Sequence, residues 1–287
     1  MFLMDPISKI FLYLFLVTSM LGIGLQTSVG DMRLLLESKG LLLRLLIANF
    51  VVVPVIGIAM AKLMNFPPEI ATAMILLACT PGGISAVQFT SKIKTSLAFA
   101  GGSAVALSFL SMIVSPFLLM VVLPSVSTGI PYGRVFLNIA VFLLFPLAVG
   151  MLVRFKGEKS ATRLVKPFAL IGTISFIIVV ILIMDERKQA MNAIEARVVF
   201  SMLAFILLSM AVGWFLGGPD RETRQISATA SSMRFVALSL VIALNSFPSP
   251  EIYAPLIAFS ALMIPPNLLF TIFYIVQKKR QSKKSIA

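Results

Sequence analysis

The stretch that decides the fold is ILLACTPGGISAVQFTSKIK, residues 75–94, in which Pro81, Gly82 and Gly83 interrupt an apolar run. Proline removes a backbone donor and glycine frees the backbone, so these three residues predict a helix break. A second stretch, ISATASSMRFVALSLVIAL (residues 226–244), gathers hydroxyl side chains just before Arg234. One interrupted segment in each half of an apolar chain indicates a transporter site near the bilayer midplane. The alternative for the first stretch is a proline kink without a ligand.

The composition predicts an integral membrane protein. Of the 287 residues, 59% are hydrophobic and 12% charged, and the mean hydropathy is +1.03. Soluble domains are about half apolar and a quarter charged, so a soluble enzyme, a nucleic-acid binder and a disordered chain are excluded. With one cysteine and no histidine, the commonest zinc and haem ligands are missing. We therefore expect no metal site and no cofactor.

Nine apolar stretches are long enough to cross a bilayer as helices, which takes about 20 residues. They are residues 7–26, 40–64, 68–94, 95–124, 132–154, 164–184, 197–217, 223–247 and 252–277. The sequence therefore predicts an all-α polytopic membrane protein with one integral membrane domain over residues 1–287. The first stretch lacks a basic lead-in and a small-residue cleavage site, so we expect a permanent helix rather than a signal peptide.

The charges predict the orientation. Sixteen Lys and Arg fall on one side of the nine spans, including the expected 154–166 loop and the basic tail 278–287, against six on the other. Basic loops stay in the cytoplasm, so we expect an inner-membrane protein with an outer N-terminus and a cytoplasmic C-terminus. All eleven acidic residues fall in loops or at helix ends, which leaves Arg234 as the one charge at membrane depth.

Three runs of sequence resemble the bile acid:sodium symporter family. They are GIGLQTSVGDMRLLL (22–36), NFVVVPVIGIAMAKLMNFPPEIATAMILLACTPGGISA (49–86) and SFLSMIVSPFLLMVVLP (108–124). The resemblance implies an inverted-repeat transporter with a panel domain and a core domain, in which two broken helices cross. The resemblance also implies that the family's first helix has no counterpart in this sequence. The core would cover about 68–124 and 223–277, and the panel about 7–26 and 132–184.

The resemblance also implies where sodium would bind, and there this sequence departs from the family. A Ser-Asn pair of ligands falls at Ala86 and Val87, and the shared glutamate falls at Ala230. The remaining matches for ion ligands are Asn49, Met233 and Arg234, and those for two substrate-facing residues are Ile84 and Phe235. Sodium favours oxygen ligands, and a guanidinium a few ångströms from it costs several kcal/mol at an effective dielectric of about 20. Ordinary sodium binding should therefore be lost, and only a weak ion-binding set remains: Asn49, Thr229, Ala230 and Met233.

Arg234 has two readings, which are compatible with each other. It could be a built-in cation that attracts an anion, or it could cap the carbonyl ends of the broken helix. The candidate substrate-binding residues cluster around both interrupted segments. They are Arg234, Ser85, Gln88, Thr90, Ser231, Ser232 and Asn267.

The function predicted from these features is secondary transport of small or amphipathic organic anions, without the usual sodium sites. Bile-acid-like molecules and keto or hydroxy acids are implied by the resemblance alone. One alternative is a sodium-coupled symporter with rearranged ligands, and another is a membrane protein that binds a ligand without transporting it. An enzyme is not expected, because neither histidine nor a deep carboxylate is available for acid–base chemistry. The expected partners are the lipid bilayer and a small anionic substrate, without nucleic acid or a required protein.

Overall fold

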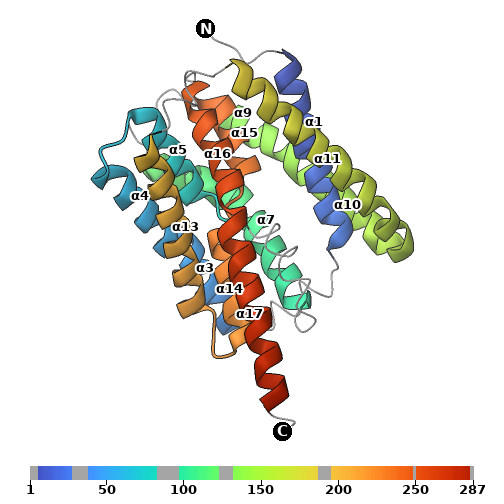
Figure 1. Ribbon diagram of the computed structural model, residues 1–287. Coiled ribbons are helices and arrows are strands. Elements are labelled where there is room, and N and C mark those ends of the chain that lie inside the picture. The colour runs from blue at the N-terminus through green and yellow to red at the C-terminus, as the bar shows by residue number, and fades with distance from the viewer. Residues whose placement is uncertain are drawn as a thin grey trace.

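The chain is described by a computed structural model over residues 6–27, 38–82, 97–122, 132–186, 195–247 and 250–284. Within these ranges every named element is a helix, and the one pairing of β type is an isolated bridge between Pro81 and Arg234. Figure 1 shows the helices in two groups, with α1, α10 and α11 lying to one side of the others. The prediction of an all-α fold is confirmed.

The first half of the chain contains two apolar rods that are each built from an α-helix, a π-helical turn and a second α-helix. The elements are α1 (Pro6–Gln26), α3 (Lys39–Ile47), η1 (Ala48–Val52), α4 (Val53–Leu63), α5 (Pro68–Cys79), α7 (Leu97–Val122), α9 (Tyr132–Ile139), η2 (Ala140–Leu144) and α10 (Phe145–Lys156). Both π-helical turns end just before a proline, Pro54 or Pro146. A proline ring clashes with the carbonyl one turn earlier, and the wider turn gives that carbonyl room.

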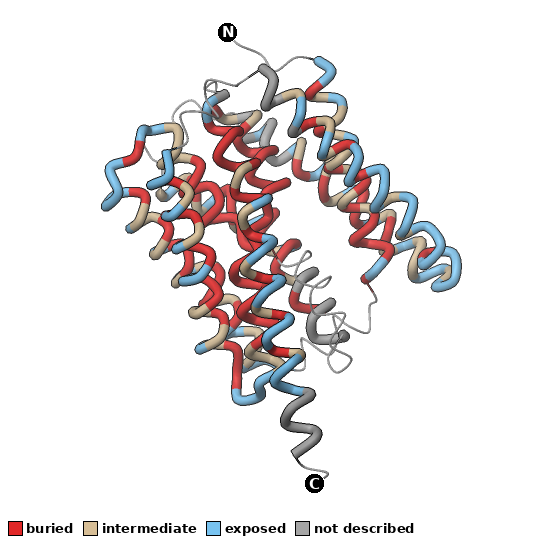
Figure 2. The backbone as a smooth tube through the Cα atoms, viewed as in Figure 1, coloured by how far each residue is buried: buried red, intermediate tan, exposed pale blue. Residues whose placement is uncertain are grey.

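The second half contains a long helix, a straight span and then two broken helices. The elements are α11 (Glu158–Glu186), α13 (Ala196–Leu216), α14 (Arg221–Ser232), α15 (Val236–Ser246), η3 (Pro250–Ile252), α16 (Tyr253–Leu262) and α17 (Ile264–Lys284). From Gln225 onward α14 is buried, as is most of the described part of α15, whereas α11 and α13 have many exposed residues (Figure 2). The broken helix α14–α15 therefore lies inside the protein rather than against lipid.

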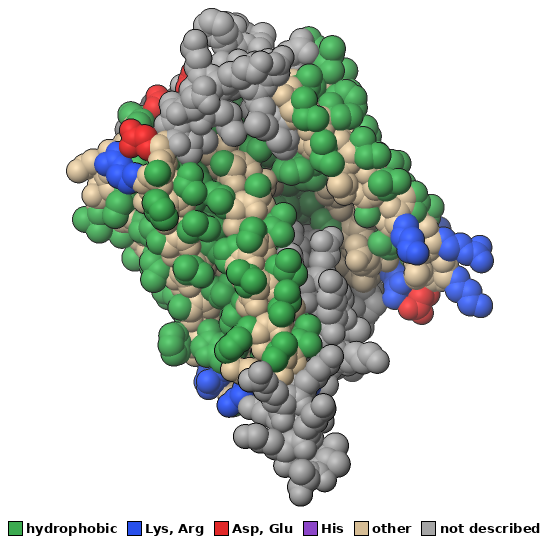
Figure 3. Space-filling model, viewed as in Figure 1, with side chains coloured by type: hydrophobic (Ala, Val, Ile, Leu, Met, Phe, Trp, Pro, Cys, Tyr) green, Lys and Arg blue, Asp and Glu red, His purple; other side chains and the backbone are tan. Residues whose placement is uncertain are grey.

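Six helical spans among the described residues are long and apolar enough to cross a membrane. They are Pro6–Gln26, Lys39–Leu63, Leu137–Lys156, Glu158–Val179, Ala196–Leu216 and Tyr253–Lys278. Hydrophobic side chains cover much of the visible surface over α13 and α17 (Figure 3), and Phe200 and Phe215 are 71% and 79% exposed. These features are those of a polytopic membrane protein. The expectations of nine spans and of an inverted repeat stay predictions.

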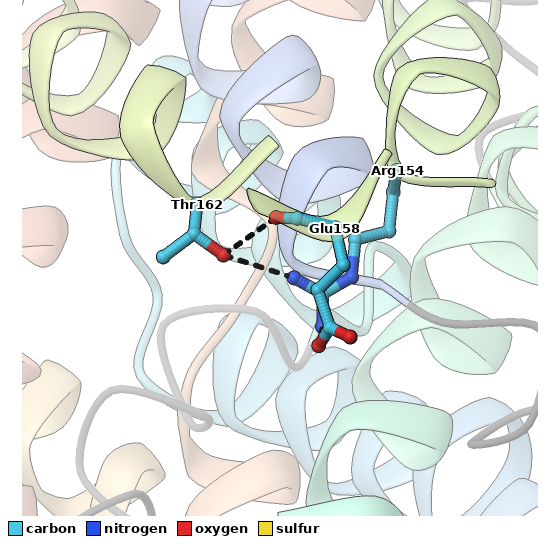
Figure 4. Close-up of polar contacts among 3 residues, drawn as sticks. All are labelled: Arg154, Glu158 and Thr162. Atoms are coloured by element: carbon cyan, nitrogen blue, oxygen red, sulfur yellow. Dashed lines mark hydrogen bonds and ion pairs between the residues drawn. The ribbon is translucent and has the colours of Figure 1, made fainter. Parts of the chain in front are cut away.

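The expected loop at residues 154–166 is wrong, because α11 already begins at Glu158 and Gly157 alone separates it from α10. Arg154 links the two helices across the turn (Figure 4): its Nη2 lies 2.6 Å from Glu158 Oε1, and its Nη1 donates to Thr162 Oγ1 at 3.3 Å. The charges in this stretch therefore belong to helix ends that extend beyond the apolar span.

Helices α1 and α10 approach each other through two glycines. A methyl group added at Gly24 would lie 2.9 Å from the Cα atom of Gly150 and 2.7 Å from the backbone nitrogen of Met151. Such close contact between backbones is the usual way in which membrane helices pack tightly. Because α11 also packs along α1, the three helices form one compact unit.

Candidate functional site

Two helices end at the same point in the interior, which we call the crossing (residues 77–82 and 231–235). Helix α5 ends at Cys79, α14 ends at Ser232, and the segments that follow them pair through the isolated Pro81–Arg234 bridge. The backbone N–H of Phe235 donates to the Thr80 carbonyl at 2.9 Å. A side chain at position 82 would overlap Phe235, whose Cα atom would lie 2.9 Å from the added carbon. Only glycine lets the two segments lie this close.

The guanidinium of Arg234 binds the open end of α5. Its Nε donates to the Leu77 carbonyl at 2.7 Å, and its Nη2 donates to the Ala78 carbonyl. In a continuous helix the Leu77 carbonyl would accept from the N–H of residue 81, but Pro81 has none. The proline that breaks α5 thereby also frees the acceptor that Arg234 takes.

Asn49 connects this end to the π-helical turn η1. Its Nδ2 donates to the Leu45 carbonyl at 3.0 Å and to Ser231 Oγ at 2.9 Å, while its Oδ1 lies 3.4 Å from Arg234 Nη1. The Ser231 carbonyl lies 3.4 Å from the same Nη1. The π-helical turn thus holds an amide whose nitrogen and oxygen both contact residues of the crossing.

The charge of Arg234 is balanced by neutral groups. Its hydrogen bonds end on the oxygens of Leu77, Ala78, Asn49 and Ser231, and the residue is 3% exposed. An ionised side chain at membrane depth faces the protein interior or a hydrated cavity. Among the described residues no group of three His, Cys, Asp or Glu lies together as a metal site would require. The crossing therefore holds a buried guanidinium whose hydrogen bonds all go to uncharged oxygens of the protein.

The remaining predicted residues divide into three groups. Ser232 Oγ donates to Asn267 Oδ1 at 2.7 Å, so these two form a pair beside the crossing. Thr229 Oγ1 donates to the carbonyl of Gln225, and Ala230 and Met233 are buried at 1% exposure. The third group, which lies outside the described residues, consists of Gly83, Ile84, Ser85, Ala86, Val87, Gln88 and Thr90.

Three hydroxyl residues at the crossing were missed from the sequence. Thr80 Oγ1 and Ser239 Oγ lie 2.6 Å apart and join α5 to α15, and Ser111 Oγ of α7 donates to the Pro81 carbonyl. Thr80 precedes the proline directly, which is a local signal that could have found it. Ser239 and Ser111 have no such signal, because isolated serines in apolar helices usually bond their own backbone.

A cavity of about 350 Å³ lies between the compact unit and the crossing. Phe15 and Phe176, whose ring centroids lie 4.9 Å apart, line it on the side of α1 and α11. Arg234 and Phe235 line it on the side of the crossing. Ligand pockets are typically 300–1,000 Å³, mostly apolar, with a few polar groups that orient the ligand. The cavity therefore suits a small molecule with an apolar body and at least one polar or anionic group.

The family model described as Sodium Bile acid symporter family matches residues 13–195. A sodium-dependent transporter of Bacillus subtilis (strain 168), YocS, is 24% identical over 207 residues, 72% of this chain and 63% of its own length. The probable sodium/metabolite cotransporter BASS2 (chloroplastic) of Oryza sativa subsp. japonica is 22% identical over 82% of this chain and 57% of its own length. The hepatic sodium/bile acid cotransporter of Rattus norvegicus is 21% identical over 95% of this chain and 75% of its own length.

The chain thus spans less than two thirds of the length of the first two relatives. All three relatives have names of transporters or cotransporters, which agrees with the expectation of a non-enzymatic membrane protein.

Proposed function

Because the chain belongs to the sodium bile acid symporter family, we propose that it is a membrane transporter of small or amphipathic organic anions, with Arg234 as a fixed cation at the crossing. The relatives' names couple transport to sodium. In this chain the guanidinium would supply the positive charge that sodium brings in those relatives. Transport of the anion would then not require sodium.

The observation that carries this proposal is the set of acceptors around Arg234. Its donors end on the Leu77 and Ala78 carbonyls and on Asn49 Oδ1, all of which are oxygens of the kind that bind sodium. A guanidinium that occupies these oxygens repels a second cation nearby by several kcal/mol at an effective dielectric of about 20. The positive charge lies at the edge of the 350 Å³ cavity, where it favours an anionic ligand.

The arrangement of helices supports alternating access. The unit of α1, α10 and α11 and the helices of the crossing face each other across the cavity (Figure 1). We assign the panel to residues 7–26 and 132–184 and the core to 68–124 and 223–277. Rocking of one bundle against the other would expose the cavity to each side in turn. In this proposal the N-terminus lies on the outer side of the membrane, and the basic tail, residues 278–287, lies in the cytoplasm.

The test is a screen of organic anions against the purified protein, with sodium or choline as the only monovalent cation. We expect the same stabilisation by a bound anion in both salts, and we expect an Arg234→Ala variant to lose most of it. Arg234→Lys is the second variant, because it keeps the positive charge that Arg234→Ala removes. An anion that stabilises only in sodium would contradict the fixed-cation proposal.

That contrary outcome defines the second candidate, a sodium-coupled organic anion symporter with rearranged ligands, which the names of the relatives favour. Its ligands would include Asn49 and backbone carbonyls of the crossing. Counterflow of a labelled anion in proteoliposomes separates both transporters from a protein that only binds, since a binder exchanges nothing across the membrane. Sodium dependence of that counterflow then decides between the two transporters.

A further inference from the structure

A row of polar side chains, buried except at its outer end, runs between α14 and α17, away from the cavity. Its members recur every three or four residues, which places them on one face of each helix. We call this row the polar seam: Glu222, Gln225, Thr229 and Ser232 on α14, and Asn267, Thr271, Tyr274 and Lys278 on α17. None of the eight lines the 350 Å³ cavity.

Two side-chain contacts fix the register of the seam. Ser232 donates to Asn267 at 2.7 Å at the crossing, and Lys278 Nζ lies 2.7 Å from Glu222 Oε1 at the other end. The ten residue steps from Glu222 to Ser232 rise about 15 Å, and the eleven from Asn267 to Lys278 rise about 17 Å. The two lengths agree, so α14 and α17 run antiparallel between these two contacts.

The middle of the seam is buried although it is polar. Gln225, Thr229 and Thr271 are 1%, 0% and 2% exposed, whereas the side chains of Glu222 and Lys278 at the outer end are 28% and 45% exposed. The hydroxyl of Thr271 is fully buried without a hydrogen-bond partner among the described residues. The amide of Gln225 reaches Thr229 Oγ1 only at 3.5 Å. A buried polar group left unpaired costs about 1–3 kcal/mol, and a water molecule with two or more polar neighbours relieves that cost.

We propose that the polar seam is a hydrated route from the basic end of the protein to the crossing, and that the Glu222–Lys278 ion pair closes its outer end. Water and small hydrophilic ions would reach the Ser232–Asn267 pair along it. The route is separate from the cavity in which we place the anion, because none of its residues lines that cavity. It does not depend on which ion, if any, drives transport.

Cysteine accessibility in nanodiscs tests this route. The sole cysteine, buried Cys79, is first replaced by alanine. A single cysteine is then placed in the seam (Thr271→Cys), on the lipid-facing side of the same helix (Leu269→Cys, 66% exposed) or at an exposed position on α11 (Ser160→Cys). The probe is a cationic methanethiosulfonate, which modifies thiols where water reaches the sulfur, because the thiolate is the nucleophile.

We expect Thr271→Cys to react at least about tenfold faster than Leu269→Cys and more slowly than Ser160→Cys, because only hydrated sulfur forms thiolate readily. Adding Glu222→Gln should raise the Thr271→Cys rate about two- to fivefold, the bias that an ion pair of this exposure exerts. Gln225→Cys, which probes the seam from α14, replaces Thr271→Cys if the latter is not monodisperse. If the seam cysteines are as unreactive as Leu269→Cys, even with Glu222→Gln, the hydrated route does not exist. If the rates are equal with and without the ion pair, the Glu222–Lys278 pair does not close the outer end of the route.

Discussion

The two helix ends that meet at the crossing stop for different reasons. Helix α5 ends beside Pro81 and Gly82, residues that break a helix in any setting. Between α14 and α15 stand Met233, Arg234 and Phe235, none of which breaks a helix by itself. There the backbone leaves the helix because Arg234 and the N–H of Phe235 find acceptors on the open end of α5. The first break is local chemistry, and the second depends on the first.

Replacing Arg234 by leucine should break this dependence and have the largest effect. The Leu77 and Ala78 carbonyls would lose their donors, and each buried unpaired group costs about 1–3 kcal/mol. We expect a fall of about 2–5 kcal/mol in the free energy of unfolding, measured by denaturation in detergent. The matched control is Arg197→Leu, at a side chain that is 51% exposed. Similar losses for both variants would mean that the second break does not depend on the guanidinium.

Adding one carbon to the first break should have the next largest effect. In Gly82→Ala the new methyl group meets Phe235, so the two segments must move apart. Overpacking of this kind costs about 1–3 kcal/mol. Gly40→Ala is the control, because nothing lies within 4 Å of its added carbon. A Gly82→Ala protein with an unchanged midpoint of thermal unfolding would show that the segments need not lie this close.

The hydroxyl contact between Thr80 and Ser239 tests whether the two breaks hold each other in place, because it joins the end of α5 to the helix after the second break. A double-mutant cycle with Thr80→Val and Ser239→Ala should give a coupling of about 0.6 kcal/mol, and at most about 1.7, as for other hydrogen bonds between membrane helices. Additive effects of the two substitutions would mean that the contact contributes nothing to holding the breaks together.

The smallest effect on the free energy of unfolding is expected for a substitution in the turn between α10 and α11. Glu158 is 75% exposed and pairs with Arg154 across the turn at Gly157. Glu158→Gln should change the free energy of unfolding by about 0.5 kcal/mol or less, because exposed ion pairs contribute little. A loss as large as that of Gly82→Ala in the same denaturation series would contradict this ranking of buried and exposed junctions.

The sequence made the buried architecture predictable where the signal is local. A proline followed by two glycines in an apolar run indicates a break at Pro81, and a lone charge in an apolar run indicates that Arg234 lies inside the protein. The prediction of a loop at residues 154–166 was wrong because it took charged residues as a sign of a loop. Helix α11 continues through charged residues from Glu158 onward.

The partners at the crossing could not be predicted, because they come from segments far apart in the chain. Asn49 lies 185 residues from Arg234, and Ser239 lies 159 residues from Thr80. An isolated serine in an apolar helix gives no indication of which helix it will meet. The π-helical turn that orients Asn49 follows from Pro54, yet the wider turn and a simple kink are equally compatible with that proline.

A guanidinium fastened to the Leu77 and Ala78 carbonyls has an electrical consequence. A co-transported sodium ion neutralises its anion and then leaves, but a tethered charge remains with the protein after each turnover. Under the proposed mechanism every monovalent anion therefore crosses as a net negative charge. An interior-negative potential of 100 mV would oppose its entry by about 2.3 kcal/mol and favour its exit by the same amount. The resting voltage of the cell would bias this carrier towards export.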